Sequence, residues 1–122
     1  MEEEHAIFTS TGPAAVHREA RMGKYNKTSV IAKGCPVFEQ VEKQENENQF
    51  FLFVGPGGCW RVGPDVASYS GSVLKHPKKN VKTPPKSDWL YYLDNKWHKD
   101  EDLQLIMNEN EIIPGKLLFQ KA

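Results

Sequence analysis

From Gly23 onward the chain is a succession of short segments rich in Val, Ile, Phe, Tyr and Trp, separated by Gly, Pro, Asn and Asp. β-Branched and aromatic residues favour strands, and the interrupting residues favour turns. The segment 49–54 is the clearest strand, because apolar side chains fill both of its alternating faces. A strand of this kind is expected at the centre of a sheet, where both faces are covered.

The same reasoning predicts further strands, at residues 29–32, 36–41, 59–63, 88–93, 96–98, 103–107 and 112–119. We expect 36–41, 49–54 and 59–63 to form an antiparallel meander. Asp94-Asn95 predicts a tight hairpin turn. Three prolines and five lysines between residues 75 and 86 exclude a helix and predict an extended, exposed crossover.

The N-terminal part of the chain has a different pattern. Residues 1–11 are expected to form a flexible polar tail, followed by a single β-rich domain at 12–122. Pro13 suits the first position of a helix and Gly23 suits its end, which predicts a helix over 13–22. The predicted fold is therefore mainly β: a rolled antiparallel sheet or small barrel with one short N-terminal helix.

Composition and charge exclude few functions. The 16 basic and 16 acidic residues give a net charge of zero, so global charge favours neither a nucleic acid nor a membrane partner. The start of the chain lacks the features of a signal peptide, and residues 50–54 form too short an apolar run to span a bilayer. We expect a cytoplasmic monomer in which Cys35 and Cys59 stay reduced; the two would pair only in an exported chain.

The order of several sequence landmarks is specific. The series contains Gly12-Pro13-Ala14-Ala15, Arg21-Met22-Gly23-Lys24-Tyr25, Pro36-Val37-Phe38, Phe51-Leu52-Phe53, Gly58-Cys59-Trp60-Arg61-Val62-Gly63-Pro64, Trp89-Leu90-Tyr91-Tyr92, Lys96-Trp97 and Leu103-Gln104-Leu105. It resembles an unnamed animal β module of about one hundred residues with W-x-V-G and P-P…W-x-Y-Y…W landmarks. The resemblance covers residues 12–107 and implies a β module that binds a ligand, without implying a particular activity or site.

Aromatic side chains are the first candidates for a binding site. They are Trp60, Trp89, Tyr91, Tyr92 and Trp97. An exposed aromatic face stacks on a sugar, a base or a proline, whereas a buried one packs in a core and needs a partner for its polar atom. Both readings are open for the tryptophans. The strand alternation predicts that at least one of Tyr91 and Tyr92 is partly exposed.

A lysine-rich stretch is the second candidate. Lys75, Lys78, Lys79 and Lys82 lie in a segment with no acidic residue between Asp65 and Asp88. Such a stretch neutralises phosphates or sulfates. Because it lacks arginine and interleaved aromatic residues, binding would be weak and unspecific. The alternative is a solvated loop without a ligand.

Catalytic and metal motifs are absent from the sequence. The cysteines and histidines do not have the spacing of a metal site. The glycine-rich segment 55–58 predicts a hairpin turn rather than a phosphate loop. Catalysis by Cys59 would need His76 or His98 as a base within reach. We therefore predict no catalytic residue, metal or cofactor. The expected function is non-catalytic binding of a protein or carbohydrate through exposed aromatics. The alternative is weak binding of an anion, either a phosphate or sulfate polymer or a nucleic acid, through the Lys75–Lys86 loop, although a nucleic acid is not the expected partner.

Overall fold

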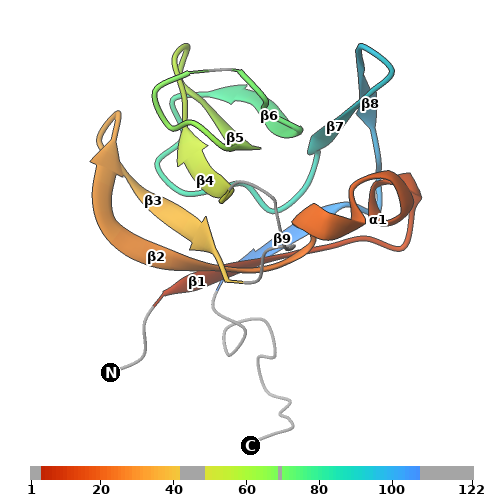
Figure 1. The fold of residues 1–122 in the computed structure, drawn as a ribbon, viewed down its shortest axis with the longest axis horizontal. Coiled ribbons are helices and arrows are strands. Elements are labelled where there is room, and N and C mark those ends of the chain that lie inside the picture. Colours follow the sequence, from red (N-terminus) through yellow and green to blue (C-terminus); the bar gives the residue numbers. More distant parts are fainter. Residues whose placement is uncertain (1–3, 42–48, 69, 108–122) are drawn as a thin grey trace, which may run out of the picture.

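The fold is seen in a computed structural model that describes residues 4–41, 49–68 and 70–107. Within these ranges nine antiparallel strands form one sheet, which curves into a half-barrel with a short helix near the N-terminus (Figure 1). The prediction of a mainly β fold, built from a rolled antiparallel sheet and one short helix, is confirmed.

The strands follow one another almost in chain order. Their order in the sheet is β8-β7-β6-β5-β4-β3-β2-β1-β9. The bounds are β1 His5–Thr9, β2 Gly23–Ala32, β3 Cys35–Gln40, β4 Phe51–Val54, β5 Cys59–Gly63, β6 Leu74–Lys79, β7 Leu90–Leu93, β8 Lys96–Lys99 and β9 Gln104–Met107. The predicted meander, now β3, β4 and β5, is confirmed by its pairing. The strand predicted at 112–119 lies outside the described residues.

Strand β1 contradicts the prediction of a polar tail over 1–11. It pairs with β2 on one side and β9 on the other. Ala6 and Phe8 are completely buried, because alternate residues of a strand point to the same face. Acidic residues precede the strand, so the segment looks polar in the sequence despite its two buried apolar residues. The strand is stabilised by pairing with strands that are distant in the sequence.

The predicted helix over 13–22 is shorter in the structure. Helix α1 spans Pro13–His17, and a separate 3-10 turn, η1, spans Glu19–Arg21. Arg18 lies between them with a non-helical φ of −129°. Its side chain donates from Nε to the Tyr92 carbonyl oxygen at 2.9 Å, so a contact with β7 replaces continuation of the helix.

The carboxylate of Asp100 holds α1 against the sheet. It accepts hydrogen bonds from Ser10 Oγ at 2.7 Å, from the Ala14 N–H at 2.9 Å and from the Asp102 N–H at 2.9 Å. Burial raises the pKa of Asp100, but these three hydrogen bonds outweigh it and leave the pKa below its ordinary value. Asp100 is therefore a charged anchor for the N-terminal segment.

The concave face of the sheet holds the hydrophobic core. The largest completely buried aromatic side chains in this core are Trp60, Trp89, Tyr25, Phe8 and Phe38. Phe8 and Trp89 meet edge to face, with centroids 4.9 Å apart, which is a favoured geometry for aromatic pairs. On the open side, the Leu105 N–H donates to the Lys86 carbonyl oxygen at 2.8 Å, linking β9 to the segment before β7.

Strand β6 corrects the prediction of an exposed crossover over 75–86. It pairs with β5 and β7, and both Leu74 and His76 are buried. The pairing of β5 with β6 shifts register between Cys59 and Arg61. A local irregularity of this kind tolerates a proline, which cannot donate to the ladder, and so accommodates Pro77.

Candidate functional site

One face of strands β5 and β6 lies opposite the core and carries charged side chains. Arg61 on β5 pairs with Lys75 on β6. Their chain neighbours Trp60 and Leu74 are completely buried on the core face. Because successive side chains of a strand point to opposite faces, Arg61 and Lys75 lie together on the outer face of the half-barrel.

Tyr92 and Trp97 extend this outer face from the β7–β8 hairpin. They are opposite each other in the hairpin register, and their ring centroids lie 5.1 Å apart. The intervening Asp94 and Asn95 have φ angles of 54° and 65°. These left-handed values are those of a type I′ turn, which matches the twist of a hairpin. The predicted hairpin is confirmed, and its tight turn sets the register that joins the two rings.

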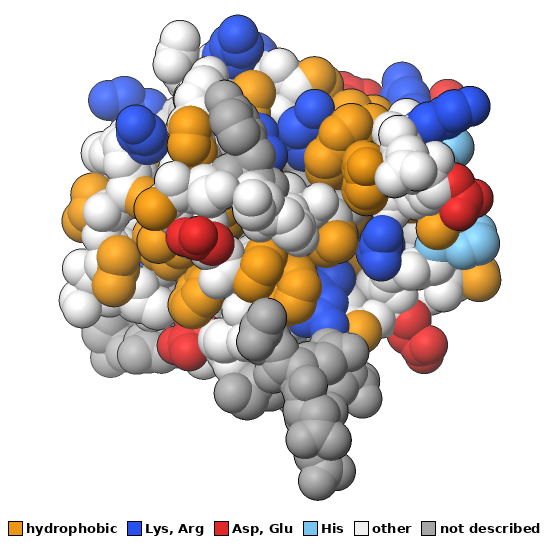
Figure 2. Space-filling view, turned by 45° about the horizontal axis from the view of Figure 1, so that its top comes forward, with side chains coloured by type: hydrophobic (Ala, Val, Ile, Leu, Met, Phe, Trp, Pro, Cys, Tyr) orange, Lys and Arg blue, Asp and Glu red, His pale blue; other side chains and the backbone are white. Residues whose placement is uncertain are grey.

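These side chains line a pocket of about 470 Å³, called the Arg61 pocket below. Its lining residues are Arg61, Gly71, Ser72, Val73, Lys75, Tyr92 and Trp97. The lining includes two cationic side chains and no acidic one, so it favours a ligand with negative charge. Figure 2 brings forward the side where β5 to β8 lie in Figure 1, and it shows hydrophobic side chains grouped between Lys and Arg side chains.

Arg61 is held rigidly at the base of this pocket. The residue is 5% exposed, and its Nη1 donates to Ser72 Oγ at 3.3 Å. The backbone of Gly55 packs against the guanidinium so closely that a Cβ there would lie 2.8 Å from Nε. A guanidinium is charged in proteins, so Arg61 brings a positively charged group to the base of the pocket.

Lys75 supplies a second charge beside an aromatic surface. Its Nζ lies 4.5 Å from the centroid of the Trp97 ring, within the range of a cation–π contact. Lys75 and Trp97 are both half-buried. The contact holds the ammonium group next to the ring, so a charged group and an aromatic face lie side by side in this pocket.

The loop before β6 completes the wall. Gly71 has a φ of 78°, and a Cβ at this position would lie 2.8 Å from the Pro64 ring. Glycine alone accommodates both the left-handed backbone and the close approach. The loop can therefore fold back on itself and place Ser72 beside Arg61.

The structure divides the predicted aromatic site. Trp60 and Trp89 are completely buried and Tyr91 is 6% exposed, so of the two readings left open for the tryptophans these two follow the core reading, and Tyr92 is the partly exposed member of the tyrosine pair. Trp60, Trp89 and Tyr91 all belong to the hydrophobic core, and each indole N–H is satisfied: Trp60 donates to the Val81 carbonyl at 2.8 Å and Trp89 to the Pro85 carbonyl at 2.7 Å. Tyr92 and Trp97 are half-buried and remain candidates.

The four predicted anion-binding lysines do not converge. Lys75 lines the Arg61 pocket, Lys78 lines a separate hollow beside His76, and Lys82 lines a third. Lys79 is exposed. Strand β6 and the segment after it point successive lysines in different directions, so they are not arranged as one binding site.

Sequence reasoning missed Arg61 and Ser72 as members of a site. Arg61 stands in a strand between Trp60 and Val62, all three of which are buried. A charged residue between apolar residues of a strand indicates a candidate site, because burying a charge is costly unless the charge is paired or functional. Nothing in the sequence indicated which loop would bring Ser72 to it.

His76 does not have the geometry of a base for Cys59. Its Nδ1 accepts a hydrogen bond from the Lys78 N–H at 3.0 Å, which leaves Nε2 to donate to the Ser87 carbonyl at 2.8 Å. The Cys59 thiol donates instead to the Pro77 carbonyl at 3.8 Å. In the described part of the chain, no three His, Cys, Asp or Glu side chains are grouped as metal ligands.

Comparison of the chain with known protein families, with curated proteins and with solved structures finds no match. None of the helices in the described ranges has the length and apolar character required to cross a membrane. The assignment of a function therefore depends on the geometry of the pocket.

Proposed function

We propose that this chain is a non-catalytic recognition module that binds an acidic carbohydrate in the Arg61 pocket. The observation that carries the proposal is the buried Arg61 guanidinium in one pocket with Lys75, Tyr92 and Trp97. Two cations and two aromatic rings in one hollow match a ligand that combines a negative charge with a flat, partly apolar body.

The two charges select for an acidic group. A guanidinium presents its N–H donors in a plane, which suits the two oxygens of a carboxylate or sulfate. Arg61 Nη1 already contacts Ser72 Oγ, so a ligand oxygen would enter a set of donors that is preorganised. Lys75 adds a second charge beside the Trp97 ring, which strengthens the attraction for an acidic group.

The two rings favour a sugar. Tyr92 and Trp97 are half-buried and tilted by 59°, which leaves aromatic surface beside the charges. The less polar face of a pyranose ring packs on such a surface, as aromatic rings with one exposed side commonly do in binding sites. A uronic acid or a sulfated sugar has both required parts in one residue.

The groups in the pocket support binding rather than proton transfer. Arg61 and Lys75 bring a guanidinium and an ammonium group to the pocket, and both groups act as hydrogen-bond donors. Their chemistry is that of donors and fixed charges. This supports a recognition role for the pocket.

An amide chemical-shift titration tests the proposal. The probes are a tetrasaccharide containing glucuronic acid and a neutral tetrasaccharide of N-acetylglucosamine at equal ionic strength. We expect saturable shifts at Arg61, Ser72, Lys75 and Trp97 with the acidic probe, and binding weaker by about tenfold with the neutral probe, because one charged contact is worth about 1–2 kcal/mol.

Matched variants locate the site. Trp97→Leu removes the ring and Lys75→Gln removes the second charge, and both are expected to weaken binding. Lys78→Gln removes an equal charge from a different hollow and should leave the affinity unchanged. Equal affinity for both tetrasaccharides, or shifts only outside the pocket, would reject the assignment; shifts with acidic peptides alone would favour a protein ligand.

A second candidate, the binding of a polyanion along Lys75–Lys86, is favoured by the exposure of Lys78, Lys79 and Lys82. A polymer can contact lysines that point in different directions, which a small ligand cannot. This mode predicts affinity that falls steeply with salt and weakens with each lysine removed. The Lys78→Gln variant therefore separates the two candidates, because it weakens polyanion binding and spares the Arg61 pocket.

A further inference from the structure

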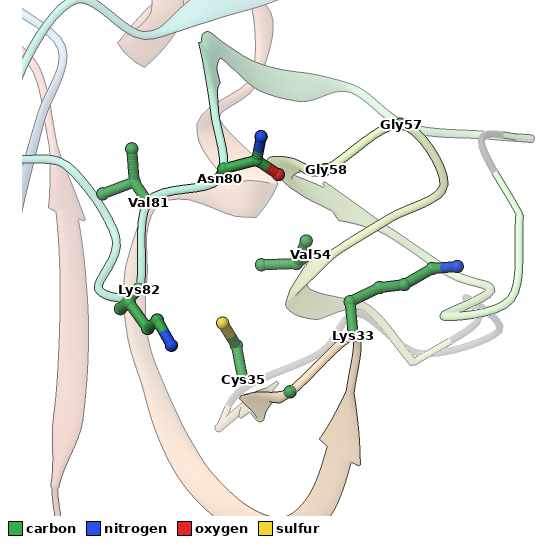
Figure 3. Close-up of a pocket in the computed structure, with 9 residues that line it drawn as sticks. Lys33, Cys35, Val54, Gly57, Gly58, Asn80, Val81 and Lys82 are labelled. Atoms are coloured by element: carbon green, nitrogen blue, oxygen red, sulfur yellow. The ribbon is translucent and has the colours of Figure 1, made fainter.

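A second cavity, of about 370 Å³, lies where the β2–β3 turn and the β4–β5 turn meet the chain after β6 (Figure 3). We call it the Cys35 pocket. Its lining residues are Lys33, Gly34, Cys35, Val54, Gly57, Gly58, Asn80, Val81 and Lys82. It shares no lining residue with the Arg61 pocket, so inferences about it do not depend on the proposed function.

The thiol of Cys35 is aimed into this cavity. Figure 3 shows Sγ pointing into the space between Val54 and Lys82. Cys35 is 7% exposed, and its thiol makes no hydrogen bond within the described ranges. Cys59 is equally buried, at 8% exposed, but its thiol contacts the Pro77 carbonyl. Of these two cysteines, Cys35 is the one whose polar group faces open space.

The surroundings of the thiol define the ligand chemistry. Lys33 and Lys82 are exposed at the rim, no acidic residue lines the cavity, and the side chain of Lys82 extends toward the thiol in Figure 3. Val54 and Val81 provide apolar walls. Positive charge at the rim and apolar surface within match a small anion with a short hydrocarbon part.

The backbone keeps the cavity open. Asn80 has a φ of 61°, and its N–H donates to the Gly58 carbonyl at 3.0 Å. Gly58 has a φ of 88°, and a Cβ there would lie 2.9 Å from Asn80 Oδ1. The β4–β5 turn and the chain after β6 are thus held together by a hydrogen bond and a close approach, which define one wall of the cavity.

We propose that the Cys35 pocket is a binding site for a small carboxylate or phosphate with a short apolar body, with Lys82 attracting the charge and the Cys35 thiol donating to the ligand. A thiol is a weak donor, so its contribution is to orient the ligand, while the lysine supplies most of the attraction. The carboxylate and phosphate versions share this chemistry and are separated by experiment.

Alkylation of the native chain tests the site. Iodoacetate is itself a small carboxylate, whereas iodoacetamide is a neutral reagent of nearly the same size. Both transfer a carbon to the thiolate sulfur and release iodide. We expect the ratio of the iodoacetate rate to the iodoacetamide rate to be about fivefold higher at Cys35 than at Cys59, as one nearby cation predicts. Peptide mass spectrometry reads both cysteines in one sample.

Variants assign the effect to the pocket. Lys82→Gln should lower the rate ratio at Cys35 toward that at Cys59, and Lys78→Gln should leave it unchanged. Equal ratios at the two cysteines, or no effect of Lys82→Gln, overturns the proposal. So does failure of both reagents to modify Cys35 while Cys59 reacts, because the cavity would then be closed to ligands of this size.

Protection distinguishes the anions. Iodoacetamide modifies Cys35 in the presence of butyrate, inorganic phosphate or chloride at constant ionic strength. Slowing by butyrate assigns a carboxylate ligand, and slowing by phosphate assigns a phosphate ligand. If neither anion slows the reaction more than chloride does, the proposal is wrong.

Discussion

Two aromatic pairs near the β7–β8 hairpin differ in what surrounds them. Trp89 and Tyr91 face the concave side, where Trp89 is completely buried and its N–H is bonded to a backbone carbonyl. Tyr92 and Trp97 face the outer side, where both are half-buried beside Lys75. Neighbouring residues of one strand, Tyr91 and Tyr92, therefore belong to different parts of the molecule.

The difference shows that aromatic density alone does not mark a binding surface. Strand geometry assigns alternate residues to opposite faces, and the partners on each face then decide the role. On the concave side the rings meet other rings, as Phe8 meets Trp89. On the outer side they meet the charges of Lys75 and Arg61. The core and the proposed recognition surface are thus separated by one position along the strand.

Replacement of the inner and outer tryptophans provides the strongest test of this separation. Trp89→Ala should lower the free energy of unfolding by about 3–5 kcal/mol, because it empties a large buried volume. Trp97→Ala should cost only about 1–2 kcal/mol, the value of its contacts with Tyr92 and Lys75. Urea unfolding followed by circular dichroism measures both. Similar losses for the two variants would contradict the division of the hairpin.

The sequence predicted most of the strands of this fold, since the alternation in β4 and the turn at Asp94-Asn95 are local signals. It did not predict β1 or β6. Strand β1 has two buried residues and depends on its pairing with β2 and β9. Strand β6 contains Pro77, and a proline argues against a strand in the sequence. The structure accommodates it through the register shift in the pairing of β6 with β5.

The candidate site was predictable only in part, for a similar reason. Tyr92, Trp97 and Lys75 were identified by residue type. Their association requires the order of β6, β7 and β8 in the sheet, which no local pattern contains. Arg61 was overlooked because its significance comes from burial, and burial is a property of the whole fold.

Substitution of Asp100, which anchors α1, is expected to lower the stability of the fold without changing any residue of the Arg61 pocket. Asp100→Asn should reduce stability by about 1–3 kcal/mol, because an amide nitrogen cannot accept a hydrogen bond where the carboxylate did. Asp102→Asn is the control: its backbone N–H remains, and its exposed side chain should change stability by less than about 0.5 kcal/mol. Equal effects would show that Asp100 is not the anchor of α1.

The pH dependence of stability tests the same anchor. The folded-state pKa of Asp100 is lowered, so the unfolded chain binds more protons in this range and stability rises with pH. The contribution of Asp100 is present above its ordinary pKa of about 3.9 and is lost as the pH falls through the lower folded value. We expect the wild type to lose this increment below about pH 4 and Asp100→Asn to lack it. Identical stability profiles would contradict the prediction.

The contact between Lys75 and Trp97 gives the smallest expected effect. A double-mutant cycle with Lys75→Gln and Trp97→Leu should yield a coupling energy of about 0.5–1 kcal/mol, the value of a partly exposed cation–π contact. The exposed ion pair of Lys99 and Asp88, at 3.9 Å, is the matched control, and its coupling should be near zero in 0.5 M salt because salt screens it. If the Lys75–Trp97 coupling disappears as well, the ammonium is not held at the ring. Lys75 and Trp97 would then act as independent groups on the outer face. The outer face would differ from the core side, where aromatic rings pack against one another, even more than the geometry indicates.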